Sequence, residues 1–419
     1  MTRLQHDRTT SETAVLTPGA AHAAERVGNA SLTWRDRLLL LAVAALVLVP
    51  GMQVSLFDRD EGWYAQVARE MLESGDWLVP RYLGEVWIAK PPLLYWFVAG
   101  TYKLLGMGNW QARLVPVLAG CINVLLAGTL GAAMLGRRVG LLAGILLATS
   151  GLFATVGKML LTDGVMLACT LGAILLHWRM RERPTHRGTL LYWVLIGAGV
   201  LAKGPATLVF AGAFGLGLLI GGWRAWIINW RYWVWLPASI AVAAPWYVYI
   251  AGQARGTLVE QFLWYEILSR ITGAPHGHGG PPGYYLLLSL AGLLPWTALV
   301  PGAVLGGLAE RRDPIVRLLL TWLLAPWILL ELIHSKLPHY ILPCYVPLML
   351  LLARQTAAAL GTQQPLRTGD RAQQAVLKIW VGSMTAFAAV MIVPGILSLA
   401  RPYGAPLLVT GLVLIAGFV

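Results

Sequence analysis

The stretch DRDEGWYAQVAREMLESGDWLVPRYLGEVWIAKPPLLYW, residues Asp58–Trp96, is a polar segment that separates two apolar runs, each long enough to cross a membrane. Three carboxylates, Asp58, Asp60 and Glu61, cluster at its start. Asp58 and Glu61 have the Asp-x-x-Glu spacing of a helix start. Because almost all of the remaining chain is apolar, we expect its chemistry to be concentrated here.

Two surface helices are predicted within this stretch. From Trp63 to Leu72, apolar side chains recur on one face and polar ones on the other, which is typical of a helix lying flat at a membrane surface. The Lys90-Pro91-Pro92 step disfavours helix before it, so a second surface helix can span Leu93–Leu105. The carboxylates at one helix start and the lysine at the next would then face one pocket.

The composition indicates an all-α polytopic membrane protein. Hydrophobic residues make up 57% of the chain and charged residues 12%, and the mean hydropathy is +0.65. The net charge of +13 is explained by arginines in short cytoplasmic loops, so a nucleic-acid partner is not predicted. The three cysteines lie in or beside apolar runs and are interpreted as packing residues.

We predict a polar, disordered cytoplasmic tail over residues 1–37 and one membrane domain over residues 38–419, with a catalytic first outer loop at 58–111. The domain should form a bundle of about 12 transmembrane helices. These are expected near 38–57, 112–135, 139–157, 162–178, 189–202, 205–222, 232–250, 284–306, 315–333, 340–353, 376–396 and 404–419.

The lysines run against the charge pattern of this topology. With the N-terminus inside, the arginine-rich connections fall in the cytoplasm, as the positive-inside rule requires. Five of the six lysines fall outside instead, and an anionic group bound at the outer face would explain them. These lysines are Lys90, Lys103, Lys158, Lys203 and Lys336.

Further outer motifs admit two readings each. Lys158 and Asp163 in GKMLLTDG either pair at the interface or line a cavity, and Lys203 in LAKGPA either snorkels or faces a phosphate together with the next helix start. In QFLWYEILSRITGAPHGHGG, Glu266 and Arg270 are four residues apart and so share a helix face on which they can pair. The His276-x-His278 spacing fits a flexible glycine-rich loop better than a metal site. HSKLPHYILP adds Lys336, His339 and Tyr340.

An outward cavity with carboxylates and cations suits transfer of a group from a phosphate leaving group. A carboxylate can take the proton of an acceptor hydroxyl while Lys and Arg stabilise the departing phosphate. The sequence has no Walker loop, dinucleotide fingerprint or catalytic-serine motif, so a lipid-linked donor is favoured over a nucleotide. The competing classes are a lipid flippase or transporter, which would need ionisable groups at mid-membrane, and a non-catalytic lipid-binding scaffold.

These residues carry a resemblance to a known family. The stretch Asp58–Trp96 resembles the first periplasmic loop of the aminoarabinose transferases that modify lipid A, which belong with the protein O-mannosyltransferase-like glycosyltransferases of the GT-C fold (families 83 and 39). The similarity continues in collinear order through LTDG, LAKGPA, WYEILSR and KLPHYILPCYVPL.

The resemblance implies roles for individual residues. Asp60 matches the family's proposed catalytic aspartate, with Glu61 beside it, and Asp163 matches a second acid of the cavity. The residues that match those holding the donor phosphate are Lys90, Lys203, Arg270 and Tyr340, and Lys336 is added from its position beside Tyr340. No cofactor is implied.

Three positions depart from the aminoarabinose enzymes. Trp63 stands where they have arginine, Ala89 replaces a glutamate before the Lys-Pro step, and Ile267 replaces a histidine. The last two changes remove a pair resembling a zinc site, so no metal is predicted. The sugar stays open among aminoarabinose, mannose, galacturonic acid, glucose and other polyprenyl-linked sugars, and the acceptor stays open between a lipid of the lipid A type and a protein.

The resemblance further implies a polyprenyl-phosphate sugar donor, an inverting reaction, and a multi-pass protein of the bacterial inner membrane whose active site faces the periplasm. Family members usually continue into a further soluble outer domain. This chain ends at Val419 within an apolar run, so we expect a short member or a truncated product.

Overall fold

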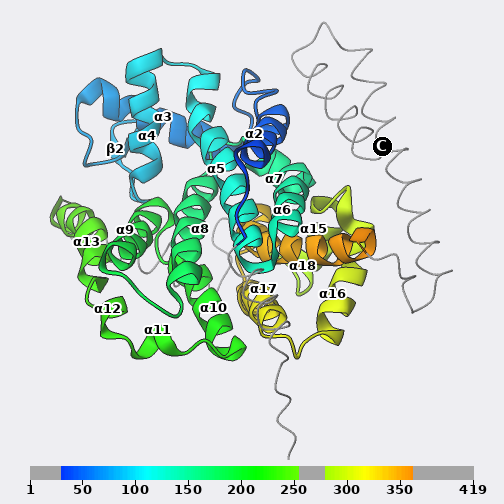
Figure 1. Cartoon of the computed structure of the whole chain (residues 1–419). Coiled ribbons are helices and arrows are strands. Elements are labelled where there is room, and N and C mark those ends of the chain that lie inside the picture. The colour runs from blue at the N-terminus through cyan, green and yellow to red at the C-terminus, as the bar shows by residue number, and fades with distance from the viewer. Residues whose placement is uncertain (1–29, 254–278, 362–419) are drawn as a thin grey trace, which may run out of the picture.

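The computed structural model describes residues 30–253 and 279–361 of the 419-residue chain (Figure 1). Within these residues the fold is helical apart from one short antiparallel hairpin, β1 (Arg81–Tyr82) paired with β2 (Glu85–Val86). The long helices are α2 (Trp34–Leu48), α5 (Asn109–Leu135), α6 (Arg137–Thr149), α8 (Thr162–Met180), α9 (His186–Lys203), α10 (Ala206–Gly221), α13 (Leu236–Gln253), α17 (Pro314–Leu332) and α18 (Leu342–Gly361).

The protein is a multi-pass membrane protein, as its composition predicts. Within the described residues four helical segments are long and apolar enough to cross a membrane, and a fifth is added if one bent pair counts as a span. This number is smaller than the predicted twelve in part because the apolar helix Ala206–Gly221 is too short for a full span, as are α2 with 15 residues and α6 with 13. The predicted helices at 376–396 and 404–419 lie outside the described residues.

Two predicted single helices are interrupted. The prediction of one helix over 284–306 is wrong: α15 (Tyr284–Gly292) and the segment Trp296–Ala309, which includes α16 (Val300–Ala309), meet at 119°. Pro295 lies at the break and has no N–H to continue a helix. The predicted helix 139–157 divides at Ser150 into α6 and α7 (Gly151–Val156), where the backbone becomes extended.

Close backbone contact joins the first helices of the bundle. α5 packs on α6 and α8, and α8 packs on α9. At Gly140 an added Cβ would lie 2.4 Å from both the Ala132 amide nitrogen and the Gly128 carbonyl oxygen. Glycine therefore permits α6 to approach the α5 backbone directly, which is how small residues pack membrane helices.

The two predicted surface helices are confirmed as elements, α3 (Arg59–Ser74) and α4 (Leu93–Leu105). They pack on each other at one end of the bundle, which we call the site end, while α11 (Ala225–Ile228) and α12 (Trp230–Trp233) lie at the far end (Figure 1). The predicted apolar face of α3 is turned inward, since Tyr64, Val67 and Met71 are buried.

The polar face of α3 holds the hairpin. The Glu70 carboxylate accepts hydrogen bonds from the backbone amides of Leu83 at 2.8 Å and Gly84 at 3.1 Å, and from the Gln66 amide at 2.8 Å. These contacts lower the pKa of Glu70 although its burial opposes the shift. The stretch Asp58–Trp96 is thus one folded unit that covers the site end.

Candidate active site

Asp58 is the residue that caps α3. Its backbone is extended and its side chain accepts a hydrogen bond from the Asp60 amide at 2.8 Å. The predicted helix start is confirmed, because α3 begins at Arg59. The Glu61 carboxylate does not return to the cap as a capping box would require.

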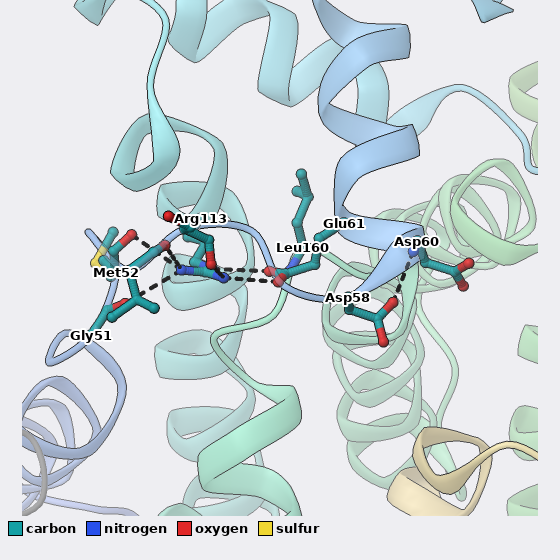
Figure 2. Close-up of polar contacts among 9 residues, drawn as sticks. Gly51, Met52, Asp58, Asp60, Glu61, Arg113 and Leu160 are labelled. Atoms are coloured by element: carbon teal, nitrogen blue, oxygen red, sulfur yellow. Dashed lines mark hydrogen bonds and ion pairs between the residues drawn. The ribbon is translucent and has the colours of Figure 1, made fainter. Parts of the chain in front are cut away.

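Glu61 is fully buried and both of its carboxylate oxygens are bound (Figure 2). Arg113 of α5 donates from Nε to Oε1 at 2.9 Å and from Nη2 to Oε2 at 2.8 Å. The Leu160 amide donates to Oε1 at 2.9 Å. These contacts leave Glu61 paired and shut away from solvent, so it does not join the other predicted site residues.

Asp60 points away from Glu61 at the start of α3 (Figure 2). Its side chain is partly exposed, and among the described residues it contacts the Tyr64 hydroxyl, which lies 3.4 Å from Oδ2. Burial raises the pKa of Tyr64 well above its usual value, and the negative charge of Asp60 raises it further. Tyr64 therefore stays a neutral phenol that can donate to Asp60.

A second polar cluster forms where α8 begins and α9 ends. Asp163, which is 2% exposed, forms an ion pair with Lys203, and His339 Nε2 lies 3.7 Å from Asp163 Oδ2. Lys203 Nζ lies 4.5 Å from the ring centre of Tyr340. The predicted residues Asp163, Lys203 and Tyr340 are thus brought together.

The Asp60 and Asp163 clusters are within electrostatic reach of each other. After burial and Asp60, the electrostatic influence of Tyr95, Tyr340 and the Asp163 carboxylate also raises the pKa of Tyr64. Tyr64 also packs edge-on against Tyr95 of α4, with ring centres 5.7 Å apart. The α3 helix and the α8 start therefore contribute one acid each to the same region.

Two predicted lysines have local partners. Lys90 is partly buried just before α4, and its ammonium donates to the Ala89 carbonyl oxygen at 3.0 Å. Lys336 is 5% exposed, and its ammonium donates to the carbonyl oxygens of Glu331 at 2.8 Å and Ile333 at 2.6 Å at the end of α17. Among the described residues, these contacts direct the Lys336 ammonium to a helix end rather than to Asp163.

The suggested pairing of Lys158 with Asp163 is wrong. Lys158 donates to the carbonyl oxygens of Val47 at 2.8 Å and Pro50 at 3.2 Å instead. Burial, with a smaller contribution from the charge of Arg113, lowers the pKa of Lys158 to about 8. Asp163 takes its cation from Lys203, forty positions along the chain.

Arg270, Glu266, His276 and His278 lie outside the described residues. Within the part of the chain that the structure describes, no group of three or more His, Cys, Asp or Glu side chains could hold a metal ion. The predicted lack of a metal site stays a prediction.

The sequence reasoning missed Arg113. It lies near the start of an apolar helix, in NWQARLVP, and is 2% exposed. An arginine inside an otherwise apolar segment is costly unless it is paired, and that cost was the available signal. The partner, fifty-two positions earlier, is not encoded by any local spacing.

Trp63, one of the departures from the aminoarabinose enzymes, belongs to an aromatic group beside Asp60. Its ring lies 5.2 Å from Trp87 and 6.3 Å from Tyr82, and the Arg59 guanidinium carbon lies 4.6 Å from its ring centre. This group joins α3 to the hairpin.

Comparison with known proteins gives consistent results. A family model described as dolichyl-phosphate-mannose-protein mannosyltransferase matches residues 89–249. The undecaprenyl phosphate-alpha-4-amino-4-deoxy-L-arabinose arabinosyl transferase of Enterobacter sp. (strain 638) is 30% identical over 377 residues, covering 88% of this chain and 65% of the relative. The enzyme of the same description from Pectobacterium carotovorum is 29% identical, covering 92% of this chain and 70% of the relative. The chain thus spans about two thirds of the length of these relatives.

Solved structures support the fold. ArnT from Cupriavidus metallidurans bound to undecaprenyl phosphate superposes with a TM-score of 0.72 at 24% identity, covering 90% of this chain and 70% of ArnT. The archaeal oligosaccharyltransferase AglB from Archaeoglobus fulgidus gives a TM-score of 0.52 at 14% identity, covering 90% of this chain and 56% of AglB. From its helical fold, its collinear motifs and these relatives, the chain belongs to the family of polyprenyl-phosphate-sugar-dependent glycosyltransferases of the GT-C fold.

Proposed function

We propose that this protein transfers a sugar from an undecaprenyl-phosphate carrier to a hydroxyl group of a lipid acceptor of the lipid A class. The arabinosyl transferases that resemble it over most of its length support this donor, and the ArnT structure that it resembles is bound to undecaprenyl phosphate. We also propose that the reaction takes place at the outer face of the bacterial inner membrane, a proposal that the multi-pass architecture and the relatives support.

The observation that carries the mechanism is the division of roles among three neighbouring carboxylates. Asp58 caps α3 and Glu61 is neutralised by Arg113, whereas Asp60 is partly exposed and contacts only the Tyr64 hydroxyl among the described residues. Asp60 is therefore the carboxylate of this cluster that can accept a proton from a bound substrate.

The proposed reaction is a single displacement. Asp60 takes the proton of the acceptor hydroxyl while its oxygen bonds to the anomeric carbon, and the bond from that carbon to the phosphate oxygen breaks. The electron pair stays on the departing undecaprenyl phosphate, and the sugar inverts. The proton on Asp60 is then lost to water.

The phosphate that leaves needs stabilising cations. Lys203, Lys90, Arg270 and the Tyr340 hydroxyl remain our proposed phosphate ligands, and the proximity of Lys203 to Tyr340 supports two of them. Lys203 also neutralises Asp163, so part of its charge is already compensated. In a site of low dielectric, even a partly compensated cation stabilises phosphate more than it would in water. Lys336 is the weakest member of this set because its ammonium binds helix carbonyls.

A protein hydroxyl is the second candidate acceptor, favoured by the match to the protein mannosyltransferase model. A lipid flippase is the alternative from another class.

The test uses purified protein with undecaprenyl-phosphate aminoarabinose, mannose, glucose or galacturonic acid, and with lipid A or a serine-rich peptide as acceptor. Release of undecaprenyl phosphate matched by sugar on lipid A supports the proposal. Sugar on the peptide alone would replace the acceptor. Donor that crosses vesicle bilayers intact, with no sugar transferred, would replace the enzyme by a flippase.

A further inference from the structure

A buried arginine and a partly buried lysine bind the segment that leads to Asp60. Arg113 donates to the carbonyl oxygens of Gly51, Met52, Val54 and Ser55, at up to 3.4 Å. Lys158 donates to those of Val47 and Pro50. Six carbonyl groups, one in the last turn of α2 and five between α2 and α3, are thus held by two side chains. We call Glu61, Arg113 and Lys158 the brace.

The brace also reaches the second acid. The Leu160 amide donates to Glu61, and Leu160 lies three residues before Asp163 at the start of α8. Lys158 belongs to the same connection between α7 and α8. The brace therefore ties the start of α3, which carries Asp60, to α5 and to the start of α8, which carries Asp163 (Figure 2).

Stability alone is a weak explanation for this arrangement. The attraction within a buried ion pair does little more than offset the free-energy cost of desolvating the two charges, and well-packed apolar residues in the same place often give a fold equal or greater stability. A bidentate carboxylate–guanidinium pair does fix distance and orientation. The pair also cancels the charge of Glu61, so Asp60 is not placed beside a second uncompensated carboxylate.

We propose that Glu61 and Arg113 are positioning residues, which set Asp60 relative to Asp163 for sugar transfer without touching the substrate. The inference rests on the proposed function and deepens it. Transfer demands alignment of hydroxyl, base and anomeric carbon, and a misplacement of about 1 Å costs on the order of 10²-fold in rate.

The far end of the bundle supplies a control pair of the same geometry, in which the arginine is 55% exposed. Asp36 of α2 and Arg137 of α6 also form a bidentate pair, with Arg137 Nε 2.6 Å from Oδ2 and Nη2 2.8 Å from Oδ1. Asp36→Asn and Arg137→Lys therefore remove the same kind of bond as Glu61→Gln and Arg113→Lys, far from Asp60. Glu61→Asp is the conservative variant, which keeps the charge but shortens the anchor by one methylene.

The experiment measures apparent Tm, kcat and donor KM for all five variants, well below each Tm, with the donor that the wild type uses. We expect Glu61→Gln and Arg113→Lys to lower kcat by about 10²-fold with donor KM little changed. Glu61→Asp should lower kcat at a Tm close to wild type. The two far-end variants should keep kcat within about twofold of wild type, with a smaller loss of Tm because Arg137 is 55% exposed and Arg113 is 2% exposed. Equal kcat losses in the two pairs, each measured well below its own Tm, would overturn the inference.

A distance measurement makes the test independent of turnover and of the proposed reaction. Spin labels at the exposed positions Arg69 of α3 and Thr155 of α7 report the placement of α3 against the segment that leads to Asp163. We expect a shifted or broadened distance distribution in Glu61→Gln and Arg113→Lys, and a wild-type distribution in the far-end variants. An unchanged distribution in the brace variants would refute positioning. An active Asp60→Asn enzyme would instead refute the proposed base and leave this result standing.

Discussion

Replacing Asp60 by asparagine separates a catalytic carboxylate from a structural one. Asparagine preserves the size of the side chain and its ability to accept a hydrogen bond, but it is far too weak a base. A lost general base commonly costs about 10²–10⁴-fold in rate, equivalent to roughly 3–5 kcal/mol of activation free energy. The folded protein loses little, because Asp60 makes one long contact with Tyr64 among the described residues.

Asp58 is the matched control two positions earlier. It caps α3, a role worth about 1 kcal/mol of stability that asparagine performs about as well as aspartate. Asp58→Asn should therefore be silent in stability and in transfer, and Asp58→Ala should lower Tm while kcat, measured below Tm, stays near wild type. Asp60→Asn should show the reverse pattern, with normal Tm, normal donor binding and a collapse of kcat.

The assay follows initial rates of sugar transfer to the acceptor in detergent or nanodiscs, with apparent Tm and donor affinity measured on the same preparations. Transfer by Asp60→Asn within tenfold of wild type would contradict a general-base role for Asp60. The base would then have to be sought in Asp163 or Glu61, each of which is buried and paired with a cation in this structure.

Three further predictions concern the cations and the topology. Lys203→Ala should destabilise the protein by roughly 3–5 kcal/mol, because it leaves Asp163 charged and buried. The double variant Lys203→Ala/Asp163→Ala should recover Tm. If donor affinity also recovers in the double variant, a phosphate contact by Lys203 is ruled out. Because the pKa of Lys158 is lowered to about 8, the folded protein binds fewer protons than the unfolded one between pH 8 and 10. Over this range the free energy of unfolding of the wild type should therefore rise by up to about 1.4 kcal/mol per pH unit relative to that of Lys158→Met, measured by thermal unfolding. Stability curves of the two proteins that run parallel with pH would contradict this. In a cysteine-free background, Glu85→Cys at the site end should react with an impermeant thiol reagent in spheroplasts, and Arg183→Cys at the far end should not. The opposite labelling result would invert the proposed membrane orientation.

The local sequence pattern predicted those helices whose ends are set by residues close to them in the chain. The second surface helix spans Leu93–Leu105, as predicted from the two prolines that precede it. The membrane class follows from composition. The break at Pro295 was not predicted, because hydropathy averaged over a window does not register the loss of one backbone donor.

The partners of the site residues were the part that sequence could not supply. Glu61 pairs with Arg113 and Asp163 with Lys203, at separations of 52 and 40 residues. Periodicity shows which face of a helix is polar, but it contains no information on which distant cation meets it. Lys158 illustrates the consequence, since its nearest acid in sequence is not its partner.

The positions of Asp60 and Glu61 next to each other in the sequence have a physical consequence for the direction in which each side chain points. Consecutive residues on an α-helix are separated by about 100° around its axis, so two neighbouring acids at a helix start cannot face the same partner. In α3 this separation turns Glu61 toward Arg113 and Asp60 to the opposite side (Figure 2). The buried acid fixes the rotation of the first turn, and that rotation aims the partly exposed acid. The order of the two residues therefore matters as much as their presence, because exchanging them would move the longer side chain out of the ion pair.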